Sequence, residues 1–78
     1  MANEEHLKLI KQGVDIWNAW REKCPEIHPD LSQADLRGVK LQKINLGNTN
    51  LKESKLQFSN LTGAQLGEAN LTKSKLQE

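Results

Sequence analysis

The chain after residue 30 places a leucine at every fifth position without a break. The ten leucines are Leu31, Leu36, Leu41, Leu46, Leu51, Leu56, Leu61, Leu66, Leu71 and Leu76. A period of five advances a side chain by about 140° around an α-helix, and on a flat strand it sends successive side chains to opposite faces. The leucines can share one interior only if the backbone turns after every five residues. The pattern therefore predicts a solenoid of five-residue units.

The positions between the leucines follow the same period. After an opening proline, the residue two places before each leucine is small or β-branched, and the residue directly before it is always polar. Ala34-Asp35-Leu36 and Ala69-Asn70-Leu71 match the consensus A(D/N)LXX, so residues 29–78 resemble the pentapeptide-repeat family. The resemblance implies four units to each coil. The expected fold is an all-β solenoid, a right-handed quadrilateral β-helix of about two and a half coils with an N-terminal capping α-helix.

The pattern of apolar and polar positions in residues 3–24 predicts one amphipathic helix. Asn3 is a suitable N-cap, and Pro25 ends the helix at or before Cys24. The helix carries an apolar stripe formed by Leu7, Ile10, Val14, Trp17 and Trp20. A stripe of this width needs a surface to cover, and the first coil provides one. We therefore divide the chain into a capping helix and hinge, residues 1–28, and a repeat region, residues 29–78. The alternative is that Trp17 and Trp20 form an exposed partner-binding patch.

The other end of the repeat region carries no capping signal. The last leucine, Leu76, falls part-way round a coil, which predicts an open edge of backbone groups beside an unshielded leucine layer. Such an edge is a template for pairing, so we expect an end-to-end homodimer through this end. Two alternatives stay open: the last residues fray and the chain is monomeric, or the sequence is a piece of a longer protein.

No residue pattern indicates catalysis. Phosphate-binding loops, nucleophile elbows and zinc-protease motifs are absent from the sequence. Cys24, His28 and the distant His6 are too few and too scattered for a structural zinc site. We expect neither enzyme activity nor a cofactor or metal. The single cysteine fits a reducing compartment, the sequence contains no apolar run long enough to span a membrane, and the expected location is the cytoplasm.

The outward positions suggest one candidate surface. Units twenty residues apart are expected to stack, which gathers basic residues at one corner against Asp35 and Glu53. The possible partner surface consists of Arg37, Lys52, Lys55, Phe58, Lys73 and Lys75. The alternative interpretation is a solvated lysine-rich face that discourages aggregation.

These patterns favour a non-catalytic structural or protein-interaction module whose partner is another protein or a second copy. The resemblance also offers an alternative, a DNA-mimic inhibitor of a DNA topoisomerase. That role requires a long, acidic rod, whereas the repeat region is short and the whole chain has a net charge of +1. Direct binding of nucleic acid is disfavoured because the basic corner lacks interleaved aromatic side chains.

Overall fold

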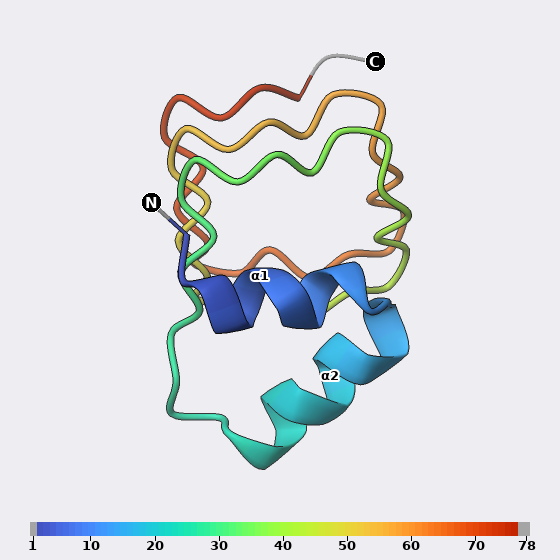
Figure 1. The fold of residues 1–78 in the computed structure, drawn as a ribbon, viewed down its shortest axis with the longest axis vertical. Coiled ribbons are helices and arrows are strands. Elements are labelled where there is room, and N and C mark those ends of the chain that lie inside the picture. Colours follow the sequence, from blue (N-terminus) through green and yellow to red (C-terminus); the bar gives the residue numbers. More distant parts are fainter. Residues whose placement is uncertain (1, 77–78) are drawn as a thin grey trace.

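The N-terminal region forms two short helices rather than one. The computed structural model describes residues 2–76, and in it α1 spans Glu4–Lys11 and α2 spans Val14–Lys23 (Figure 1). The predicted N-cap is confirmed, because the Asn3 side chain accepts the N–H groups of Glu5 and His6. The prediction of a single helix is wrong: Gly13 has a φ of 118°, which breaks the helix and is accessible at little cost only to glycine.

The repeat region winds into stacked four-sided coils (Figure 1). Each bridge joins parallel segments twenty residues, and hence four units, apart. The bridged pairs are Asp30 with Asn50, Asp35 with Lys55, Lys40 with Asn60, Asn45 with Gln65, Asn50 with Asn70, and Lys55 with Lys75.

The predicted fold class, an all-β solenoid in the form of a right-handed quadrilateral β-helix, is wrong for the part of the chain that the structure describes. Residues 2–76 contain two α-helices and no β-strand, and the coils pair only through isolated bridges. The reason is the length of the unit. One residue in each unit enters a bridge before a turn interrupts the pairing, whereas strands usually need three or more consecutive extended residues.

A tight turn closes each five-residue unit. The N–H group of the small residue donates to the carbonyl oxygen of the preceding leucine, as from Ala34 to Leu31 over 3.1 Å. The residue before this donor has a left-handed backbone in all nine turns. Asp or Asn directly before a leucine often accepts the N–H group two residues later, as Asn50 does from Lys52 over 3.0 Å. The turn is therefore built into each unit by local hydrogen bonds.

The leucine column is buried to different depths along the stack. Leu31, Leu36, Leu41, Leu46, Leu51 and Leu56 are at most 2% exposed. Leu61, Leu66 and Leu71 are half-buried, and Leu76 is 51% exposed. Ile10 from α1 and Trp17 from α2 are buried in the same cluster, so the helices close one end of the leucine core.

In the units that begin at Asp30, Asp35, Lys40, Asn45 and Asn50, three hydrogen bonds join each unit to the unit twenty residues later. For the unit of Lys40, the N–H of Leu41 donates to the Asn60 carbonyl over 2.8 Å, and the N–H of Lys43 donates to the Thr62 carbonyl over 2.9 Å. In the other direction, the N–H of Asn60 donates to the Val39 carbonyl over 3.1 Å. The edge of a coil that faces the next coil, here called its C-terminal edge, thus offers two donors and one acceptor per unit. Its N-terminal edge offers two acceptors and one donor.

Neither of the two described helices has the length and the apolar character that crossing a membrane requires.

Replacing Leu51 by Asp should abolish folding. Leu51 is fully buried in the middle of the column, and an unpaired carboxylate there costs more than the marginal stability of a small domain provides. Circular dichroism with thermal unfolding should show no cooperative transition. The matched control is Lys52→Asp at the neighbouring exposed position, which should unfold close to the wild type; a folded Leu51→Asp variant would contradict the buried column.

Candidate functional site

Side chains of α2 cover the N-terminal edge of the first coil at the unit of Asn45. The Trp17 Nε1–H donates to the Asn45 carbonyl over 2.7 Å, and Arg21 Nη2–H donates to the Gly47 carbonyl over 2.7 Å. The N–H of Asn45 donates to the Asn18 side-chain oxygen over 2.8 Å. Two donors and one acceptor are the set that a preceding coil would present. One turn of α2 therefore replaces a missing five-residue unit.

The start of α1 covers the same edge at the unit of Asp30. The N–H of Asn3 donates to the Asp30 carbonyl over 2.9 Å, and the N–H of Asp30 donates to His6 Nδ1 over 3.0 Å. The His6 ring lies 5.0 Å from the Trp20 ring, centroid to centroid. Burial lowers the pKa of His6 from its usual value of 6.5, against the opposing effects of Asp30 and Glu5. A neutral imidazole is the form that accepts this hydrogen bond.

Arg21 is a charged side chain buried in the contact between the helices and the first coil, which we call the junction. It is only 7% exposed, and its Nη1–H donates to the Thr49 hydroxyl over 3.0 Å. Burial lowers the pKa of Arg21. Trp17 and Trp20 can be predicted from the sequence as apolar cap residues, whereas the polar cap roles of Asn18, Arg21 and His6 were not predicted. The available signal was that Arg21 follows Trp17 by four residues and so lies on the same helix face.

The C-terminal edge at the opposite end of the stack is open between residues 59 and 73. Six amide N–H groups along it have no hydrogen-bond partner among the described residues: those of Leu61, Gly63, Leu66, Glu68, Leu71 and Lys73. The equivalent amides one coil earlier all donate to the next coil, as Leu41 does to Asn60. We call this stretch, residues 59–73, the open edge.

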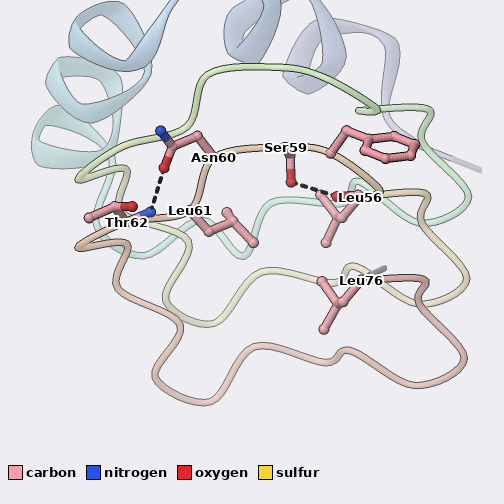
Figure 2. A pocket seen from close by; sticks show the side chains of 7 residues that line it. Leu56, Ser59, Asn60, Leu61, Thr62 and Leu76 are labelled. Atoms are coloured by element: carbon pink, nitrogen blue, oxygen red, sulfur yellow. Dashed lines mark hydrogen bonds between the residues drawn. The ribbon is translucent and has the colours of Figure 1, made fainter. Parts of the chain in front are cut away.

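A cleft lies beside the open edge, where the last described unit stops (Figure 2). It has a volume of about 560 Å³ and is lined by Leu56, Phe58, Ser59, Asn60, Leu61, Thr62 and Leu76. Figure 2 shows Leu61 and Leu76 on different segments around this space. The cleft combines the partly exposed side chains of Leu61 and Leu76 with the unpaired N–H group of Leu61, which is the chemistry of a site for a polypeptide segment.

One cation of the predicted basic surface is paired with a carboxylate. Arg37 forms an ion pair with Asp35 over 2.8 Å. Hydrogen bonds donated by the side chain and the backbone N–H of Arg37 lower the pKa of the Asp35 carboxyl to about 2. Lys55 stacks between Asp35 and Lys75 in one column of bridged residues. The other two lysines of the set, Lys52 and Lys73, belong to the preceding side of the coil. The charge of Arg37 is thus neutralised locally.

Phe58 is the most exposed large apolar side chain among the described residues. It is 73% exposed and has a φ of 63°. A bulky side chain in the left-handed region is strained, and an exposed ring regains little by packing. Neither local conformation nor core packing accounts for a phenylalanine at this turn, which lines the cleft.

The described residues offer no metal site, since no three His, Cys, Asp or Glu side chains gather there. Cys24 is a free, half-buried thiol.

A family model of pentapeptide repeats matches residues 30–67 and residues 49–78, in eight copies. The chain belongs to the pentapeptide-repeat family. No curated protein and no solved structure matches the chain. Within this family assignment, the features particular to the chain are the helical junction at one end of the repeats and the open edge at the other.

The partly buried His6 in the junction predicts that the free energy of unfolding decreases in weak acid. Because the pKa of His6 is lower in the folded state, the unfolded chain takes up a proton first as the pH drops through 6.5. The contribution of neutral His6 to the free energy of unfolding is complete above pH 6.5. It is lost progressively below this pH, until His6 in the folded state is also protonated. Thermal unfolding across this range should show the loss in the wild type. In His6→Asn, whose side-chain oxygen can accept the same hydrogen bond without titrating, the loss should be smaller; equal pH dependence would contradict the assignment.

Phe58→Asn should stabilise the fold. Asparagine adopts the left-handed conformation more readily, and the ring removed is mostly exposed, so we expect a gain of about 1 kcal/mol in the free energy of unfolding. Denaturant unfolding would measure it. Thr62→Asn, at an exposed position that is not left-handed, is the control and should change little. A destabilised Phe58→Asn would show that the ring supports the fold.

Proposed function

We propose that this chain is a non-catalytic protein-interaction module that presents its open edge and the adjoining cleft to other polypeptide chains. The proposal rests on one observation: the backbone groups at one end of the stack have hydrogen-bond partners among residues 2–76, and those at the other end do not. At the N-terminal edge, helix side chains satisfy backbone groups of the first coil. At the open edge, six successive donors of the same kind lack partners among the described residues.

Unpaired backbone groups beside partly exposed leucines give such a surface affinity for protein rather than for a small metabolite. A polypeptide supplies both the carbonyl acceptors and the apolar side chains that this edge lacks. The preceding coil also holds the edge in a fixed geometry, since three hydrogen bonds join the unit of Asn60 to the unit of Lys40. A prearranged edge lowers the entropic cost of binding.

The proposal assigns no reaction, cofactor or metal to the chain. It includes a reducing, cytoplasmic location, which the single cysteine supports. The homodimer expected from the sequence would be one form of this role and stays a prediction.

Affinity capture would test the proposed role. Immobilised wild-type protein should retain specific proteins from a host lysate after nuclease treatment. Leu76→Arg places a charge in the cleft at a residue that is already half-exposed, and should lose those proteins. Gln33→Arg, in an exposed turn of the first coil, is the matched control and should retain them. Retention of nothing by the wild type, or equal retention by both variants, would overturn the proposal.

A further inference from the structure

We propose that the start of α1 is a pH-sensitive switch, which leaves the first coil when His6 takes up a proton while α2 stays in place. α1 lies across one end of the stack, and hydrogen bonds to Asp30 hold its start there (Figure 1). The Asp30 carbonyl accepts the N–H of Asn3 over 2.9 Å, and the Asp30 N–H donates to His6 Nδ1 over 3.0 Å. The switch acts at the junction and does not depend on the open edge, so it goes beyond the proposed interaction function.

The hydrogen bond between Asp30 and His6 exists only while the imidazole is neutral. Nδ1 accepts the Asp30 N–H through its lone pair, and protonation of Nδ1 would leave two N–H donors facing each other at 3.0 Å. Turning the ring provides no other acceptor, because an imidazolium ion carries a proton on both nitrogens. The Trp20 ring packs against the imidazole, 5.0 Å away between centroids, and restricts its movement on that side. Protonation therefore breaks this contact.

The charged groups around His6 come from all three elements that meet here. Glu5 of α1 and Asp30 of the first unit favour the imidazolium ion, whereas burial and Arg21 of α2 oppose it. The Asp30 carboxylate is engaged in its own turn, where it accepts the N–H and the hydroxyl of Ser32. Burial is the largest effect, so the pKa of His6 is below its usual value of 6.5 while α1 is in place. A released imidazole in water binds the proton more tightly, and weak acid therefore favours release.

The contacts of α2 do not titrate in the same range. Trp17, Asn18 and Arg21 hold α2 on the unit of Asn45 through an indole, an amide and a guanidinium group. None of these groups changes its protonation state in weak acid. Gly13, with a φ of 118°, separates the two helices and allows the backbone of α1 to move independently of α2. We therefore expect α2 to remain on the first coil after the start of α1 has left.

The attachment of α1 is weaker at its start than at its end. Ile10, near the end of the helix, is 1% exposed and belongs to the leucine core. Leu7 is only half-buried, and a cleft of about 310 Å³ lies beside it, between α1 and the first coil. A helix of eight residues has little stability of its own. Its first turn should therefore unwind once the hydrogen bonds to Asp30 break.

Release would uncover part of the N-terminal edge of the stack. The N–H and the carbonyl of Asp30 would lose their partners, and Leu7 would leave the leucine core against which it packs. The first coil would then present unpaired backbone groups beside apolar side chains in weak acid, and a covered surface at neutral pH. The device thus couples the exposure of a surface to the protonation of one side chain.

Hydrogen exchange measured by NMR on the full 78-residue protein labelled with ¹⁵N would test the switch. The Leu7 amide, which donates to the Asn3 carbonyl over 2.9 Å, reports on the first turn of α1. From about pH 8 to about pH 5, the range in which histidine titrates, protection of the Asp30 and Leu7 amides should fall by up to about tenfold per pH unit, the limit for release coupled to one proton. The Asn45 amide and the Trp17 indole N–H should stay more strongly protected throughout, because α2 remains in place.

Three variants assign the effect to one side chain. His6→Asn keeps a side-chain acceptor that does not titrate, so protection at Asp30 should lose its pH dependence in this range. His6→Ala removes the acceptor and should lower protection at Asp30 already at neutral pH. His28→Asn, at the exposed second histidine of the chain, is the matched control and should behave as the wild type does.

Constant protection at Asp30 while the ring signals of His6 show its protonation would overturn the proposal, because the imidazolium ion would then be accommodated with α1 in place. Equal protection at Asp30 and Asn45 at every pH would also overturn it, since acid would then unfold the chain as a whole. The same pH dependence in His6→Asn would reject His6 as the titrating group. The experiment contains no binding partner, so its failure would leave the proposed interaction function standing.

Discussion

The parallel hydrogen-bond register between coils is the constraint on which the rest of the structure depends. Each unit from that of Asp30 to that of Asn50 is bonded to the unit twenty residues later through two donors in one direction and one in the other. This inequality gives every coil two chemically different edges. A stack of identical coils therefore has an acceptor-rich end and a donor-rich end. The unpaired backbone groups at each end need a different kind of hydrogen-bond partner. Such polarity resembles that of an α-helix, whose ends also expose donors at one terminus and acceptors at the other.

The helices provide hydrogen-bond partners for the backbone groups at the acceptor-rich end. Trp17, Asn18 and Arg21 reproduce with side chains the donors and acceptor that a preceding coil would supply to the unit of Asn45. Arg21 has no carboxylate partner among residues 2–76, and its guanidinium group donates instead to both Gly47 and Thr49. The junction is thus a mixed apolar and polar contact, in which Ile10 and Trp17 close the leucine core while the polar groups satisfy the backbone.

Local chemistry made part of the fold predictable. The five-residue leucine period required a repeated turn, and the aspartate or asparagine before many leucines supports that turn with its own hydrogen bond. The pentapeptide family could likewise be identified from residues such as Ala34-Asp35-Leu36. The predicted strands were wrong because one paired residue per unit does not make a strand. The single predicted helix was wrong because the apolar stripe continues across Gly13, where the backbone does not.

The sequence by itself determined the repeat, its inward leucines as a pattern, and the start of the first helix at Asn3, because each of these follows from residues a few positions apart. Only the tertiary structure decided which polar groups meet at the junction and which backbone donors are left at the open edge. Those outcomes depend on residues more than twenty positions apart, such as Arg21 with Gly47 and His6 with Asp30. They also depend on the direction in which each backbone N–H group points, a property that side-chain identity does not encode.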